Sequence, residues 1–166
     1  VNVARNGGPG QYTGVFLRGA PAGFTRVMLD GVEINDPGSV GTAFDFAHLN
    51  VAGIERIEVL RGPQSTLYGS DAMAGVINIV TRKGAGVPST YVSAEGGSFD
   101  TVRLGAGAQG ETNGVNYAFD VAYHQTDGVS AFDKRDGFSE RDGYENYTVS
   151  GRVGADVAEN VSIDAI

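Results

Sequence analysis

The second half of the chain, from about residue 85, is dominated by strict alternation of apolar and polar side chains. In the clearest run the apolar positions are Val115, Tyr117, Phe119, Val121 and Tyr123, and the positions between them are Asn116, Ala118, Asp120, Ala122 and His124. Successive side chains of a strand point to opposite faces of a sheet, so this period of two predicts a β-strand. Similar runs at residues 102–109 and 147–157, with a segment from Ser89, predict four or five strands in all.

The connections between these strands differ in length. Short turns are expected at residues 96–100, 110–114 and 158–160, and a long loop at residues 126–144. Strands of about 9–11 residues with this period match a tilted crossing of a bilayer. A soluble sandwich alternates too, but Gly, Ser, Asp, Arg and His on the second face favour a water-filled lumen. If residues 83–88 enter from the periplasmic side, the long loop is extracellular.

The first half has shorter elements with more turn residues. Strands are expected at residues 15–18, 26–29, 32–34, 54–61 and 76–80, and short helical turns at residues 44–49, 65–67 and 71–74. Ser65 is the expected cap of the second helical turn. Asp30-Gly31 predicts a type I′ hairpin turn, which needs positive φ at both central residues. Gly62-Pro63 is expected to end a strand, because proline cannot donate to a ladder. The pattern is typical of a small α+β domain.

Charge divides the chain at a similar place. The net charge is −8; residues 1–84 have seven basic and seven acidic side chains, and residues 85–166 have five basic and thirteen acidic ones. We therefore expect a domain boundary near residues 83–87. An acidic chain without a basic patch argues against nucleic-acid binding. We find no catalytic constellation and expect no enzyme.

Five short motifs in the first half occur together and in order. They are Phe16-Leu17-Arg18-Gly19, Leu29-Asp30-Gly31-Val32, Ile57-Glu58-Val59-Leu60-Arg61-Gly62-Pro63, Leu67-Tyr68-Gly69-Ser70-Asp71-Ala72 and Gly75-Val76-Ile77-Asn78-Ile79-Val80-Thr81. This set resembles the plug domain of TonB-dependent outer-membrane receptors. The resemblance implies an α+β plug domain at residues 1–84, without its N-terminal part. It also implies that residues 85–166 are the first antiparallel transmembrane strands of a truncated, incomplete β-barrel.

The same resemblance implies site residues. The plug motif positions are Gly19, Asp30, Gly31, Gly62, Pro63, Tyr68, Gly69, Gly75 and Asn78. Contacts between plug and barrel are expected at Arg18, Glu58, Arg61 and Arg82. The simpler alternative is that these strand charges face solvent. Arginine suits a reversible polar interface because its planar fork binds carboxylates in a bidentate manner.

The resemblance also implies a function. Receptors of this kind take up a scarce nutrient chelate, a cobalamin or a ferric siderophore, while the plug occludes the barrel pore. The expected location is the lipid of a Gram-negative outer membrane. The expected partner is a TonB-type energy-coupling protein in the periplasm, whose binding peptide we expect to be missing from this sequence. Residues 35–41 and 44–50 are expected near the ligand, without assigned contacts.

The long loop is strongly acidic. Its acids are Asp133, Asp136, Glu140, Asp142 and Glu145. Hard oxygen ligands beside glycines make this a candidate calcium site, although Arg135 breaks the EF-hand spacing. A solvated acidic loop is the alternative, and no other cofactor is expected. An acidic loop after the third barrel strand resembles the cobalamin receptors. A different hypothesis for the whole chain is a soluble, calcium-dependent, β-rich ligand-binding domain.

Overall fold

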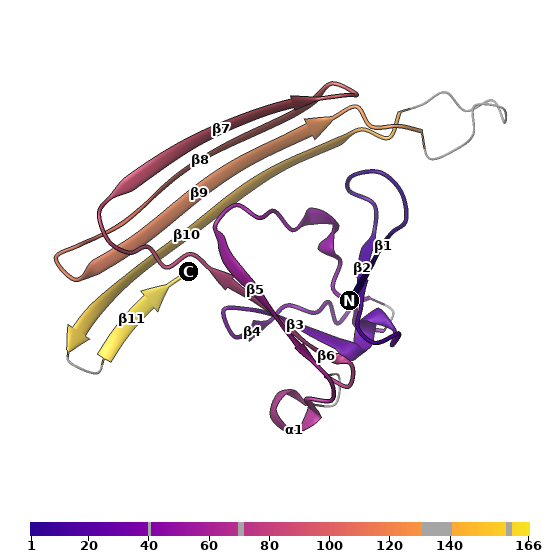
Figure 1. Cartoon of the computed structure of the whole chain (residues 1–166), viewed down its shortest axis with the longest axis horizontal. Coiled ribbons are helices and arrows are strands. Elements are labelled where there is room, and N and C mark those ends of the chain that lie inside the picture. The colour runs from indigo at the N-terminus through magenta and orange to yellow at the C-terminus, as the bar shows by residue number, and fades with distance from the viewer. Residues whose placement is uncertain (40, 70–71, 131–140, 159–160) are drawn as a thin grey trace. The chain divides into compact units, whose positions relative to one another are not determined.

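The computed structural model describes residues 1–39, 41–69, 72–130, 141–158 and 161–166 (Figure 1). The chain divides into two compact units. The first unit comprises residues 1–49 and 54–81, and the second comprises residues 50–53 and 82–166. No helix in the described ranges is both long enough and apolar enough to cross a membrane.

The first unit is built on a mixed four-stranded sheet with the order β4-β3-β6-β5. Its strands are β3 (Thr25–Leu29), β4 (Val32–Glu33), β5 (Ile54–Arg61) and β6 (Gly75–Thr81). β3 runs parallel to β6 and antiparallel to β4, and β5 runs antiparallel to β6. A separate hairpin pairs β1 (Asn2–Arg5) with β2 (Thr13–Phe16). The described residues of the unit also form three short helical turns: η1 (Ala22–Phe24), η2 (Phe46–His48) and α1 (Ser65–Tyr68).

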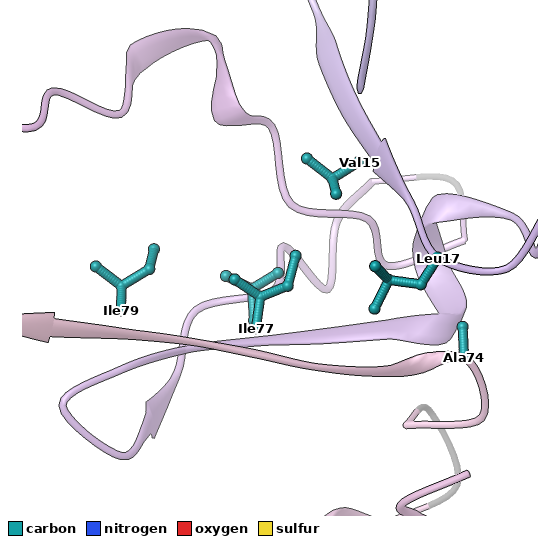
Figure 2. Packing of buried hydrophobic residues seen from close by; sticks show 6 residues of the cluster. Val15, Leu17, Ala74, Ile77 and Ile79 are labelled. Atoms are coloured by element: carbon teal, nitrogen blue, oxygen red, sulfur yellow. The ribbon is translucent and has the colours of Figure 1, made fainter. Parts of the chain in front are cut away.

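A small apolar core lies on one face of β6. Its members are Val15, Leu17, Val27, Ala74, Ile77 and Ile79 (Figure 2). Leu17 and Ile79 are fully buried. Burying a side chain of this size stabilises a fold by about 1.5–3 kcal/mol, so this cluster is the main apolar contribution to the first unit. Phe44 and Phe46 pack beside it, with ring centroids 4.8 Å apart in an edge-to-face arrangement.

The strand predictions for this unit are confirmed with shifts of a few residues, and β1 was missed. The predicted turn between β3 and β4 is also confirmed, with φ of 47° at Asp30 and 85° at Gly31. Ile57 and Val59 share a face with Ile79 and Ile77, their register partners on β6. They are nevertheless 47% and 37% exposed, because β5 is the edge strand and the core covers β3 and β6.

The predicted helical turns are only partly right. Within residues 44–49, only Phe46–His48 form a 3₁₀ turn; Asp45 is its N-cap, and the Asp45 carboxylate accepts from the Ala47 amide. Ser65 is the first residue of α1 and not its cap; the cap is Gln64, which makes no side-chain capping bond. Of the turn predicted at residues 71–74, residues 72–74 are not helical, and the remainder lies outside the described residues. Segments this short have too few internal hydrogen bonds to maintain a helix unaided.

The second unit is an antiparallel meander of five neighbouring strands (Figure 1). They are β7 (Ser89–Gly97), β8 (Thr101–Thr112), β9 (Val115–Thr126), β10 (Tyr144–Ala158) and β11 (Val161–Ala165). The predicted alternation is confirmed. β9 ends at Thr126 and β10 begins at Tyr144, at the bounds predicted for the long loop, of which residues 131–140 lie outside the described residues. The turn expected at residues 110–114 is shorter than predicted: β8 continues to Thr112, and only Asn113-Gly114, both at positive φ, connects it to β9. Within the described residues the sheet stays open at β7 and β11.

The two faces of β9 have opposite exposure. Phe119 and Val121 are 49% and 48% exposed, whereas Asp120 between them is 3% exposed. A soluble sandwich would bury the apolar face, because burying apolar area is what stabilises it. The soluble, calcium-dependent domain is therefore not supported. The pattern is the one expected for strands that place apolar side chains toward lipid and polar ones inward.

Candidate functional site

The Asp30 turn ties the end of β6 to the β3–β4 hairpin. The Asp30 amide donates to the Ile79 carbonyl oxygen over 2.9 Å. Its carboxylate accepts twice from Thr81: Oδ1 from the backbone amide at 2.9 Å, and Oδ2 from the hydroxyl at 2.6 Å. Hydrogen bonds to an ionised acceptor are stronger than neutral ones. The last residue of the first unit is therefore fixed by a charged partner.

The Asn35 side chain fixes the loop that follows β4 through three hydrogen bonds. Its Oδ1 accepts from the Val27 amide at 2.6 Å, and its Nδ2 donates to the carbonyl oxygens of Thr25 and Thr42 at 3.1 and 2.8 Å. One side chain thus joins β3 to both ends of the loop predicted to lie near the ligand. Sequence reasoning missed this residue, because its three partners come together only in the folded chain.

Glu58 and Asn78 meet on the face of β5 and β6 opposite the apolar core. Glu58 Oε1 accepts from Arg56 Nε at 2.8 Å, and Oε2 accepts from Asn78 Nδ2 at 3.0 Å. These two donors, first Arg56 and then Asn78, hold the pKa of the Glu58 carboxyl below its usual value. The hydrogen bond to Glu58 is also the main reason why the pKa of Arg56 is raised. Arg56, Glu58 and Asn78 thus form a charged network that joins β5 to β6.

The residues predicted as plug–barrel contacts fall into different units. Arg18, at φ 56°, lies two residues after the end of β2, and its guanidinium lies beside Gly62 of the same unit. Glu58 and Arg61 are on β5, and Arg61 is exposed. Arg82 belongs to the second unit, where its Nη1 lies 3.0 Å from Asp120 Oδ1. A plug–barrel contact stays a prediction for all four residues.

The remaining motif positions are turns or strand ends of the first unit. Gly19 follows Arg18, Pro63 follows Gly62, Tyr68 ends α1, and Gly69 is the C-cap of α1. Gly75 begins β6 at φ 150°, where a Cβ would collide with the Leu60 carbonyl oxygen. Any other residue at position 75 would therefore push β5 and β6 apart.

Among the described residues of the second unit, Asp120 is the most buried charged residue. Its side chain is 2% exposed and accepts from Tyr91 Oη at 2.7 Å as well as from Arg82. The Arg82 guanidinium carbon lies 5.8 Å from the centroid of the Tyr91 ring. A buried carboxylate is tolerated only when it is paired and hydrogen-bonded, and these two donors meet that need.

The structure describes only part of the candidate calcium loop. Asp133, Asp136 and Glu140 lie outside the described residues. Glu145, on β10, accepts from the hydroxyls of Tyr123 and Tyr147 at 3.1 and 2.8 Å. Across the described part of the chain, no three His, Cys, Asp or Glu side chains are grouped so as to hold a metal ion. Calcium binding stays a prediction.

Comparison with known proteins agrees with this geometry. The family model of the TonB-dependent receptor plug domain matches residues 1–76. The vitamin B12 transporter BtuB of Photobacterium profundum is 38% identical over 160 residues, which is 93% of this chain and 25% of the relative.

Solved structures give the same result. The siderophore receptor PirA of Acinetobacter baumannii is 26% identical with a TM-score of 0.69, over 98% of this chain and 26% of that one. The pyoverdine receptor FpvA of Pseudomonas aeruginosa, 18% identical with a TM-score of 0.77, shares the fold over 98% of this chain and 22% of that one. The chain thus spans about a quarter of the length of these relatives. Residues 1–76 thus match the plug domain of TonB-dependent receptors, and the chain shares the fold of these solved receptors, with a plug domain followed by antiparallel strands of an incomplete β-barrel.

Proposed function

We propose that the full-length receptor containing this chain takes up a scarce nutrient chelate across the outer membrane. The observation that carries the proposal is the contrast between exposed Phe119 and buried Asp120 in strands that follow a plug-family domain. Such strands suit a wall with lipid on one side and a polar lumen on the other. A TonB-type protein in the periplasm is the proposed source of energy, and the plug is proposed to occlude the pore.

Cobalamin is the preferred cargo, and a ferric siderophore is the second candidate. The relative that is 38% identical carries the name vitamin B12 transporter. The siderophore receptors reported above are 26% and 18% identical to this chain. The loop pinned by Asn35 is proposed to lie on the ligand side of the plug.

The contacts of the plug are part of the same proposal. Arg18, Glu58 and Arg61 are proposed to contact the barrel wall through wet, reversible polar pairs. Residues 83–88 are proposed to enter the barrel from the periplasmic side, which places the acidic loop outside the cell. Calcium bound by that loop, through Asp133, Asp136, Glu140, Asp142 and Glu145, would then order it near the cargo.

The test is a binding titration of the purified full-length receptor in detergent. Cyanocobalamin and a ferric siderophore are titrated separately, with calcium and with a chelator. We expect saturable binding of cyanocobalamin that tightens with calcium. The D133N/D136N variant should lose the calcium effect, and the control E111Q, at the far end of β8, should retain it. If neither cyanocobalamin nor the ferric siderophore shows saturable binding, the proposed function is contradicted.

A further inference from the structure

The segment that joins β6 to β7, residues 82–88, is held by hydrogen bonds and ion pairs within the second unit; we call it the strap. The Arg82 amide donates to the Gly53 carbonyl oxygen at 2.7 Å, and the Gly86 carbonyl oxygen accepts from the Glu111 amide at 3.0 Å. All of these residues belong to the second unit. The strap therefore has a backbone hydrogen bond near each end.

Two consecutive cations of the strap meet two carboxylates on different strands. Arg82 Nη1 lies 3.0 Å from Asp120 on β9, and Lys83 Nζ lies 3.6 Å from Asp164 on β11. Asp164 also accepts from Arg152 Nε of β10 at 3.3 Å. Because β10 lies between β9 and β11, the two ion pairs hold the strap at separate points across the sheet.

The pair at Asp120 is the stronger of the two because of its burial. The Asp120 side chain is 2% exposed, whereas Asp164 is 25% exposed. A buried carboxylate that lost Arg82 would remain desolvated without its counter-ion, and that is strongly unfavourable. The exposed fraction of Lys83, 46%, makes its pair with Asp164 weaker and more sensitive to salt.

One residue of the strap fits closely against the sheet. Gly84, at φ 75°, lies against the backbone of Tyr117, and a Cβ there would collide with the Tyr117 carbonyl oxygen. The sequence of the strap, Lys83-Gly84-Ala85-Gly86, reads as a flexible linker. This close approach instead describes a fitted segment.

We propose that the strap is a fixed anchor, held by Asp120 and Asp164, which stays on the sheet while cargo is taken up. Rearrangement of the first unit during uptake then ends at Thr81, and residues 82–88 do not follow it. The uptake part of this inference rests on the proposed function; the attachment of the strap does not.

Hydrogen–deuterium exchange of the full-length receptor in detergent tests the attachment. In the unaltered receptor the Arg82 and Glu111 amides should exchange at least tenfold more slowly than the Asn113 and Gly114 turn amides. The D120N/D164N variant should raise the Arg82 exchange rate at least tenfold. The matched control is E95Q, which removes a carboxylate from the exposed pair with Arg103 and should leave that rate unchanged. Fast exchange at Arg82 in the unaltered receptor, or no change in D120N/D164N, would overturn the anchor.

A cross-link tests whether the strap stays in place during uptake. In the K83C/D164C variant a short bifunctional thiol reagent joins the strap to β11, and uptake of radiolabelled cyanocobalamin by cells is compared before and after reaction. If the strap is fixed, the uptake rates before and after cross-linking should lie within about twofold of each other. Retained binding with abolished uptake after cross-linking would overturn the proposal. Absence of uptake by the unaltered receptor would count against the proposed function, and the exchange rates would still decide the attachment of the strap.

Discussion

The Thr81 hydroxyl donates to Asp30 Oδ2 over 2.6 Å, although 51 residues separate the two in the chain. The next residue, Arg82, pairs with a different carboxylate, Asp120. The boundary between the two compact units thus falls between adjacent residues, each fixed by its own acid. One acid secures the end of the plug sheet, and the other secures the start of the strap.

Removal of the Asp30 carboxylate should loosen the end of β6. D30A takes away two hydrogen-bond acceptors from Thr81, and losing partners of partly buried groups costs about 1–3 kcal/mol. We expect the Thr81 amide to exchange correspondingly faster in the full-length receptor. The control is D36N, whose carboxylate accepts from Gly38 in an exposed turn and should not affect Thr81. An unchanged exchange rate of the Thr81 amide in D30A would show that the hydrogen bonds between Asp30 and Thr81 do not stabilise the end of β6.

Asn35 should be one of the least replaceable polar residues of the plug. N35A leaves the Val27 amide and two carbonyl oxygens without their partner, which should lower the local opening free energy at Val27 by about 1–3 kcal/mol. N35D should also fail, because its second oxygen would face the Thr25 and Thr42 carbonyl oxygens. The measurement is the exchange rate of the Val27 amide, with the exposed Asn6 (N6A) as control. Full protection of Val27 in N35D would contradict this account.

The Glu58 network predicts that the pairing of β5 with β6 is weakened at acid pH. The pKa of the folded-state carboxyl is lowered, chiefly by the hydrogen bond from Arg56 and then by that from Asn78. The stabilisation is therefore fully present above the unfolded pKa, about 4.3, and is lost as the pH falls through the folded-state value.

Two measurements check that sign. A side-chain carboxyl NMR titration of glutamate-labelled receptor should give Glu58 a midpoint below the unfolded value of about 4.3. The E58Q variant should remove this acid-linked loosening between β5 and β6, because its amide does not titrate in this range. A Glu58 midpoint at or above about 4.3 would mean that the pair with Arg56 does not form in solution.

An arginine placed on one face or the other of β8 and β9 should distinguish the face that contacts lipid from the face that lines the lumen. F119R places a charge on the apolar face, which costs about 2–4 kcal/mol near the bilayer midplane. Q109R places the same charge on the opposite face and should be tolerated. The measurement is the amount of heat-modifiable, folded receptor in the outer membrane. Equal yields of the two variants would contradict the assignment of the faces.

The sequence predicted most of the second unit, because each strand there carries its own period of two and needs no distant partner to be recognised. The end of β8 was misplaced, since Gly110 looks like a turn residue but lies in a strand against Pro88. In the first unit the ends of β3, β5 and β6 were near their predicted positions. The helical turns were overpredicted, because so few residues carry little periodicity.

Some features of the candidate site were not accessible from the sequence. The three contacts of Asn35 and the tie between Asp30 and Thr81 join segments that meet only in the folded chain. The exposure of Ile57 and Val59 depends on β5 being an edge strand, which the alternation of side chains does not reveal. The partners of Arg82 within the second unit, Asp120 and Tyr91, could not be named from the sequence either.

The measurement that tests the central claim most directly is a spin-label scan of β9 in the full-length receptor reconstituted into lipid vesicles. Single labels are placed in turn at each position from 115 to 124, and accessibility to oxygen is compared with accessibility to a water-soluble nickel chelate. We predict a period of two, with oxygen favoured at Tyr117, Phe119, Val121 and Tyr123 and disfavoured at the positions between them. Uniform accessibility, or oxygen favoured at Ala118 and Ala122 instead, would contradict a wall with its apolar face toward lipid.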